Sequence, residues 1–93
     1  MKLEFEWDET KASDNYKKHG ISFDLATKVF EDPFALEFID DRQDHPEERF
    51  VILGMAGSDL VYVAYTERES RIRLISARRA AKYEEEHYFQ QNS

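Results

Sequence analysis

The sequence contains no cysteine and only three histidines among its 93 residues. The absence of cysteine excludes disulfide bonds and thiolate chemistry, and it fits a reducing compartment. Three scattered histidines without cysteine partners lack the spacing of metal ligands, so we expect neither a metal nor a cofactor. No apolar run has the length of a membrane span, and the N-terminal residues lack the apolar stretch of a secretion signal. These absences predict a cytoplasmic protein that does not contact a membrane.

The sequence also lacks internal repeats, low-complexity tracts and Gly/Ser-rich linkers, so we expect a single domain over residues 1–93.

Positive charge is scarce over most of the chain. The formal net charge is −7, and residues 1–67 hold seven Lys and Arg against sixteen Asp and Glu. Residues 68–82 reverse this balance, with six basic residues against one acidic residue. The asymmetry predicts a local cationic footprint on an otherwise acidic protein.

The first third of the chain shows a change from strand to helix patterns. Residues 3–7, "LEFEW", alternate apolar and acidic side chains, which is the period of a half-buried strand. Asp8 is placed to cap a helix that ends at Gly20, after basic residues that the helix macrodipole favours. Ser22 can cap a second helix, which cannot continue past Pro33.

The remainder of the chain predicts a sheet followed by a helix. A period of two recurs in four segments, residues 34–39, 49–55, 60–66 and 71–76. The last three are joined by connections short enough for hairpins. Good helix formers predict a closing helix over residues 78–90. The order is therefore β-α-α-β-β-β-β-α, an α+β fold with a largely antiparallel sheet and helices covering one face.

The segment "RIRLISARRA", residues 71–80, contains four arginines. Arg71 and Arg73 are expected on one face of their strand. Arg78 and Arg79 are expected in the first turn of the last helix, where cations oppose the macrodipole at a cost of about 0.3–1 kcal/mol each. Free backbone N–H groups at that end attract anions. Two interpretations stay open: the arginines balance the chain's own carboxylates, or they bind a phosphate.

Several motifs occur in a fixed order between Phe5 and Tyr88: W-D-x-x-K, N-x-x-K-H-G, D-P, E-E-R, T-x-R and I-S-A-R. In this combination and spacing the chain resembles the BrnT family, the ribonuclease half of the BrnT/BrnA toxin–antitoxin system. The resemblance covers almost the whole chain.

The resemblance implies a compact RelE-like fold and metal-independent cleavage of RNA, which inhibits translation. It also implies neutralisation by a small BrnA-like antitoxin of the ribbon-helix-helix type, in an assembly that we expect to be a 2:2 hetero-oligomer. Operator DNA would be contacted only through the antitoxin.

Cleavage of RNA without a metal needs a proton acceptor, a proton donor and fixed cations beside the phosphate. We expect Arg68, Arg73 and Arg78 to form one cationic, catalytic surface, because arginine binds two phosphate oxygens with one planar fork. His45 is the histidine that we expect to transfer protons, since it lies in an exposed acidic loop. His19 is explained by helix C-terminal preferences alone.

Four further cations are expected to contact RNA. Lys11, Lys18 and Arg49 belong to the motifs of the family, and Arg79 lies beside Arg78. The alternative for Arg79 is a counter-charge to the acidic half of the chain.

Two other functions compete with a nuclease. The chain can be a weakly active or inactive homologue that mainly holds its antitoxin and tunes repression, because an acidic surface attracts basic antitoxins. A stand-alone DNA-binding regulator is disfavoured by the negative net charge and by the absence of an evident recognition helix.

Overall fold

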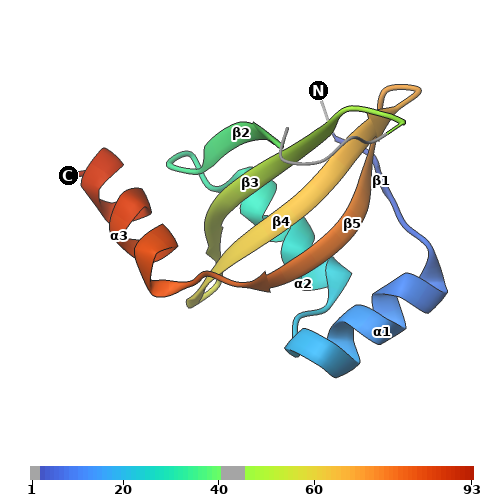
Figure 1. The fold of residues 1–93 in the computed structure, drawn as a ribbon, viewed down its shortest axis with the longest axis horizontal. Coiled ribbons are helices and arrows are strands. Elements are labelled where there is room, and N and C mark those ends of the chain that lie inside the picture. Colours follow the sequence, from blue (N-terminus) through green and yellow to red (C-terminus); the bar gives the residue numbers. More distant parts are fainter. Residues whose placement is uncertain (1–2, 41–45) are drawn as a thin grey trace.

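A five-stranded sheet forms the centre of the computed structural model, which describes residues 3–40 and 46–93 (Figure 1). The strands lie in the order β1-β5-β4-β3-β2. β1 runs parallel to β5, and the other neighbouring strands are antiparallel. The sheet is therefore largely antiparallel, as predicted. The strands are β1 Phe5–Glu6, β2 Leu36–Asp40, β3 Arg49–Ala56, β4 Asp59–Arg68 and β5 Arg71–Arg79.

Capping side chains and a glycine with a positive φ determine where the helices begin and end. The Asp8 carboxylate accepts hydrogen bonds from two backbone N–H groups of the first turn of α1, and Gly20 ends that helix with a φ of 71°. The Ser22 hydroxyl caps α2. The second predicted helix is shorter than expected, because its end tightens into a 3₁₀ turn ahead of Pro33. The helical segments are α1 Glu9–His19, α2 Phe23–Thr27, η1 Lys28–Glu31 and α3 Lys82–Gln91.

The sheet is covered by helices on both faces, so the prediction of one covered face is wrong. Ile52 packs in a core with α1, α2 and η1, whereas the next residue, Leu53, packs with Tyr88 of α3. Because neighbouring side chains of a strand point to opposite faces, α3 lies on the face opposite α2. Figure 1 shows α2 passing behind the strands and α3 standing at one end of the sheet. Part of the α3 face is left without a helix.

The last helix begins later than predicted. Arg78 and Arg79 are not in its first turn but at the end of β5, where they pair with Tyr62 and Val61 of β4. The backbone N–H and C=O groups of this segment are used by the sheet, and α3 starts at Lys82. These arginines therefore do not oppose a helix macrodipole, and the prediction that they do is wrong.

Two polar side chains connect the helices with the sheet through hydrogen bonds. The buried Asn15 amide of α1 donates to the Ala77 carbonyl at 2.8 Å and accepts from the Ala77 N–H at 3.1 Å. The Asp32 carboxylate accepts hydrogen bonds from the Met55 N–H at 2.7 Å and from the Tyr88 hydroxyl at 2.6 Å. Asp32 also accepts from the Phe34 N–H at 2.9 Å, so it forms a turn and anchors α3. None of the described helices is long and apolar enough to cross a membrane.

Candidate functional site

A pocket of about 170 Å³ collects cations from four elements of the described structure. Lys11 comes from the first turn of α1, and Arg49 comes from the start of β3. Arg68 lies at the end of β4, and Arg73 lies near the start of β5. Arg68 and Arg73 were predicted to share one catalytic surface, and Lys11 and Arg49 were predicted to contact RNA. The fold brings them to one place.

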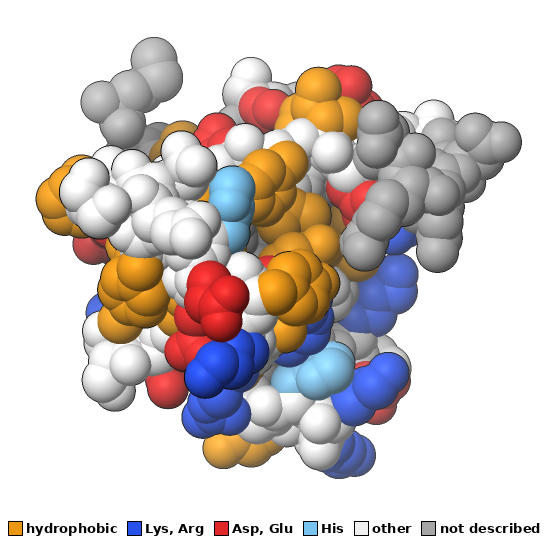
Figure 2. Space-filling model, turned by 60° about the vertical axis from the view of Figure 1, so that its left-hand side comes forward, with side chains coloured by type: hydrophobic (Ala, Val, Ile, Leu, Met, Phe, Trp, Pro, Cys, Tyr) orange, Lys and Arg blue, Asp and Glu red, His pale blue; other side chains and the backbone are white. Residues whose placement is uncertain are grey.

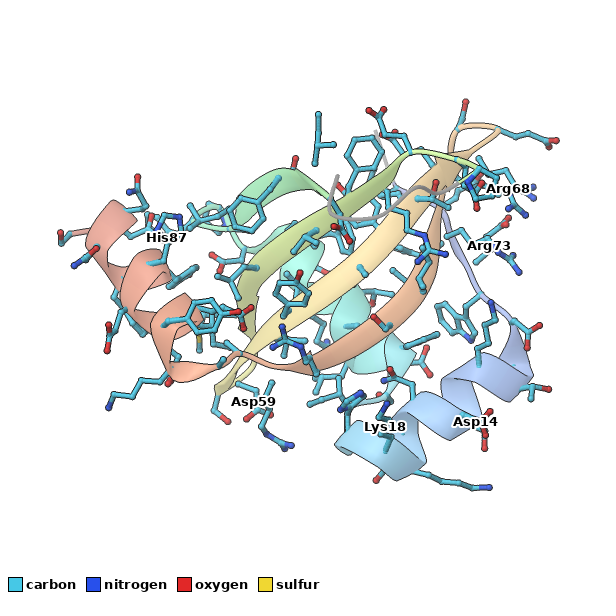
Figure 3. All side chains as sticks on the ribbon, in the orientation of Figure 1. Asp14, Lys18, Asp59, Arg68, Arg73 and His87 are labelled. Atoms are coloured by element: carbon cyan, nitrogen blue, oxygen red, sulfur yellow. The ribbon has the colours of Figure 1, made fainter. Side chains whose placement is uncertain are left out.

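Strand register explains why the arginines converge. Arg73 pairs with Thr66 of β4, and Arg68 lies two residues beyond Thr66, so the two arginines share a sheet face. The Thr66 hydroxyl donates to the Glu48 carbonyl at 2.7 Å, which fixes the chain immediately before Arg49. Figure 3 shows Arg68 and Arg73 together at the end of the sheet that is far from α3.

An irregularity in β5 adjoins the pocket. Leu74 pairs with Tyr65 and Ser76 pairs with Ala64, so Ile75 is an extra residue in the ladder. Leu74 and Ile75 both line the pocket. Bulges of this kind bend a strand and redirect its side chains, and they are frequent beside functional sites.

Two of the four cations are already paired with carboxylates. One Arg68 nitrogen, Nη2, lies 3.1 Å from both oxygens of Glu47, and Arg73 Nη1 lies 2.9 Å from Glu6 Oε2. These side chains are partly exposed, so each pair contributes little to folding stability. An anion entering the pocket would meet guanidinium groups that Glu47 and Glu6 hold in position.

The other two cations have no ion pair within residues 3–40 and 46–93. The Arg49 Nε is buried and has no hydrogen-bond partner in the part of the chain that the structure describes. A buried donor without an acceptor is costly in a folded protein and therefore needs an explanation. A phosphate oxygen in the pocket would supply the missing acceptor.

Asp8 also lines the pocket, and its chemistry is set by the helix that it caps. Hydrogen bonds from the backbone N–H groups of Lys11 and Thr10 lower the pKa of the Asp8 carboxyl. Asp8 is thus a stable anion at neutral pH and serves the helix terminus. Its role as a cap was predicted from the sequence.

Arg78 is separate from this pocket. Its guanidinium forms two hydrogen bonds with the carboxylate of Glu84, at 2.8 and 2.9 Å, and lies 4.0 Å from the centre of the Tyr62 ring. Arg78 thus joins the end of β5 to the first turn of α3. The structure does not bring it together with Arg68 and Arg73.

Arg79 and Lys18 also lie outside the lining of the pocket. The Arg79 Nε is 3.5 Å from Asp59, and its Nη1 donates to the His19 carbonyl at 3.4 Å. Lys18 is in the last turn of α1, about 10 Å along the helix from Lys11 at 1.5 Å per residue. Figure 3 places Lys18 at the opposite end of α1 from Arg73.

His45 lies outside the described residues. Glu47 was not singled out by sequence reasoning, although it belongs to the E-E-R motif, and the structure places it in the pocket beside Arg68. The missed signal was a carboxylate two residues before an arginine of the same motif. No group of His, Cys, Asp and Glu among the described residues is arranged to hold a metal ion.

The fold and this pocket define a small α+β protein in which Lys and Arg side chains from four elements line one pocket. A family model described as the ribonuclease toxin BrnT of a type II toxin–antitoxin system matches residues 7–84. The chain therefore belongs to the BrnT family of ribonuclease toxins. Comparison with curated proteins gives no match.

Proposed function

We propose that this protein is a metal-independent endoribonuclease with a RelE-like fold and that its active site is the pocket of Lys11, Arg49, Arg68 and Arg73. The observation that carries the proposal is the convergence of these cations from separate elements around the buried Arg49 Nε, which has no hydrogen-bond partner within residues 3–40 and 46–93. Family membership supplies the substrate class, which is RNA.

The proposed reaction is attack of a ribose 2′-hydroxyl on the adjacent phosphate. The 2′-oxygen forms a bond to phosphorus, the bond to the 5′-oxygen breaks, and a 2′,3′-cyclic phosphate and a 5′-hydroxyl result. Charge builds up on the non-bridging oxygens during this step. Guanidinium groups fixed beside these oxygens stabilise the transition state more than the ground state. Arg49 and Arg68 are proposed for this role.

Proton transfer is proposed for His45 or Glu47. A histidine titrates near neutral pH, so its loss should remove an inflection of kcat/KM at about pH 6.5. The Glu47 carboxylate is held beside the cations by Arg68 at 3.1 Å. The variants His45→Ala and Glu47→Gln distinguish the two residues. Only the variant that lacks the general base should lose the increase of kcat/KM with pH that deprotonation of this base produces.

Purified protein in EDTA should cleave RNA, and the Arg49→Ala and Arg68→Ala variants should lose about 100-fold in kcat/KM, as for loss of one charge-stabilising group. Lys11→Ala has a matched control in Lys17→Ala, an exposed lysine of the same helix. Undiminished cleavage by the Arg49, Arg68 and Lys11 variants would overturn the site. Arg78→Ala and Arg79→Ala, whose side chains are proposed as structural here, should cleave at a near wild-type rate per folded molecule.

The partner is proposed to be a BrnA-like ribbon-helix-helix antitoxin in a 2:2 hetero-oligomer, with operator DNA contacted through the antitoxin. The proposed biological outcome is inhibition of translation in the cytoplasm. Induced expression with and without the neighbouring reading frame tests this part, because growth should stop only when the toxin is expressed alone.

A second candidate function is that of an antitoxin-holding co-repressor with weak or no nuclease activity. The ion pairs of Arg68 with Glu47 and of Arg73 with Glu6 favour it, since the charges are partly neutralised before RNA arrives. Under this function, expression alone leaves growth unchanged and purified protein retains tight binding to the neighbour's product.

A further inference from the structure

A second hollow, of about 260 Å³, lies between α3 and the sheet, away from the cationic pocket. Its floor includes Leu53 and Tyr62 of the sheet, and its walls include Tyr83 and His87 of α3 and Phe38 of β2. Figure 2 shows the α3 side of the molecule, where hydrophobic side chains gather around a histidine with acidic side chains among them. We call this hollow the α3–β2 groove.

The α3–β2 groove is apolar and open to solvent. Tyr83 is 69% exposed and Phe38 is 38% exposed, although both are large hydrophobic side chains. Phe38 lies against His87, with 6.2 Å between the ring centres. Clustered exposed hydrophobic groups on a small protein mark a surface that another macromolecule covers. Aromatic side chains are the usual anchors of such interfaces.

The groove is bounded by a strand at the edge of the sheet. Within the described residues, β2 pairs with β3 alone, so its other edge has no strand beside it. Edge strands offer backbone N–H and C=O groups to an extended partner segment. The groove therefore combines an apolar hollow with backbone groups that can bind a peptide.

Charge around the groove selects the kind of partner. Two acidic residues, Asp40 and Glu84, are among the described residues that line it, and no Lys or Arg is among them. Arg78, the basic residue beside Glu84, already forms an ion pair with Glu84 at 2.8 Å. A phosphate chain would be repelled by this rim, whereas a protein segment with apolar anchors and flanking Lys or Arg residues would complement it.

We propose that the α3–β2 groove is the docking site of the antitoxin, which inserts an apolar side chain between Tyr83 and Phe38 and aligns a basic residue with the acidic lining of the groove at Asp40. The proposal rests on the antitoxin partner of the proposed function and not on nuclease activity. β4 connects the two sites: Tyr62 borders the groove and Arg68 borders the cationic pocket, six residues apart, roughly 20 Å along a strand. An antitoxin anchored in the groove can extend over the open sheet face toward the RNA site.

The test uses the full-length chain and, as probe, the purified product of the reading frame beside its gene. Tyr83→Ser and Phe38→Ser should each raise the Kd for this probe about 30-fold, as for an aromatic hot spot. Tyr16→Ser is the matched control, because Tyr16 is 58% exposed on α1, on the other side of the molecule, and its variant should bind within about twofold of wild type. Thermal melting confirms that the compared variants are folded. Amide hydrogen exchange of residues 36–40 should slow when the probe is bound.

Equal Kd values for the Tyr83→Ser and Tyr16→Ser variants would overturn the proposal. A raised KM for RNA in Tyr83→Ser with an unchanged Kd for the probe would overturn it in favour of a nucleic-acid site. Absence of probe binding by wild-type protein would also overturn it, whereas the RNA cleavage assay would still decide the nuclease. Conversely, a protein that cleaves no RNA but loses probe affinity in Tyr83→Ser would disprove the nuclease and support the docking site.

Discussion

The Glu84 carboxylate accepts two hydrogen bonds from the Arg78 guanidinium and a third, at 2.7 Å, from the Ala81 N–H. The end of β5 and the start of α3 are thereby joined through one side chain. Glu84 is 7% exposed, so these bonds form in a largely dry environment. The arginine of the I-S-A-R motif thus balances one of the chain's own carboxylates, which is one of the two interpretations that the sequence left open.

Glu84 should make stability depend on pH in the acid range. Burial raises the pKa of Glu84, but the hydrogen bonds from Arg78 and Ala81 outweigh burial and hold its pKa below the ordinary 4.5. A carboxyl whose pKa is lower in the folded state stabilises the protein above its unfolded pKa, and this stability is lost as pH falls through the folded pKa. Urea unfolding below about pH 4.5 should therefore show a declining free energy of unfolding.

The Glu84→Gln variant should lose this part of the pH dependence and about 1–3 kcal/mol at pH 7, because Arg78 keeps only a neutral acceptor. Glu85→Gln is its control, since Glu85 is exposed in the same first turn of α3. Identical pH profiles for the two variants would contradict the role of Glu84.

Asn15 should be a major determinant of stability for its size. Its amide donates to the carbonyls of Ile21 and Ala77 and accepts from the Ala77 N–H. Asn15→Ala leaves these buried backbone groups without partners, and we expect a loss of about 1–3 kcal/mol in the free energy of unfolding. Ser13→Ala, at an exposed position of α1, should change it by less than about 0.5 kcal/mol. A loss that small in Asn15→Ala would show that water replaces the amide.

Local elements of the fold were predictable because their causes lie within a few residues. Asp8 and Ser22 cap helices through backbone N–H groups two or three positions away, and Gly20 has the left-handed φ that ends α1. The strands follow from alternation of apolar residues. The start of α3 was not predictable in this way, because Arg78 and Arg79 are held in β5 by a ladder with β4.

The sequence predicted that basic side chains form a site, but it did not predict which of these residues lie together in the cationic pocket. The sequence predicted one cationic surface that includes Arg68 and Arg73, and it predicted Lys11 and Arg49 as further RNA contacts. The meeting of all four residues in one pocket depends on pairing between distant segments.

Arg78 is only five residues from Arg73 in sequence. Arg78 pairs with Tyr62, four residues along β4 from the partner of Arg73, so the two arginines share a sheet face but lie roughly 13 Å apart along the strand. The Glu84 carboxylate holds Arg78 there, and neither the strand register nor this ion pair is visible in a periodicity pattern.

Glu6 should restrain RNA binding by the pocket. Its carboxylate is 2.9 Å from Arg73 Nη1 and 3.6 Å from Arg71 Nη1. Glu6→Gln removes a negative charge that competes with phosphate, so the KM for RNA should fall about threefold to fivefold, which corresponds to roughly 1 kcal/mol between solvated charges. Glu4→Gln is the control, because Glu4 contacts Arg71 at 3.7 Å and no other described cation. An unchanged KM in Glu6→Gln would indicate that Arg73 is a structural residue, as the co-repressor function requires.

The number of phosphates that the pocket contacts can be measured from the salt dependence of the binding constant for RNA. For single-stranded nucleic acid, each neutralised phosphate contributes about −0.7 to the slope of log K against log salt concentration. Arg49 has no ion pair within the described residues, so its full charge is available to RNA. Arg49→Ala should therefore make the slope less steep by about 0.7, measured by fluorescence anisotropy with a labelled, non-cleavable 2′-deoxy or 2′-methoxy oligonucleotide. Lys17→Ala should leave the slope unchanged, because Lys17 is exposed and lies outside the lining of the pocket. If Arg49→Ala and Lys17→Ala give the same slope as wild type, the buried Arg49 donor does not bind phosphate.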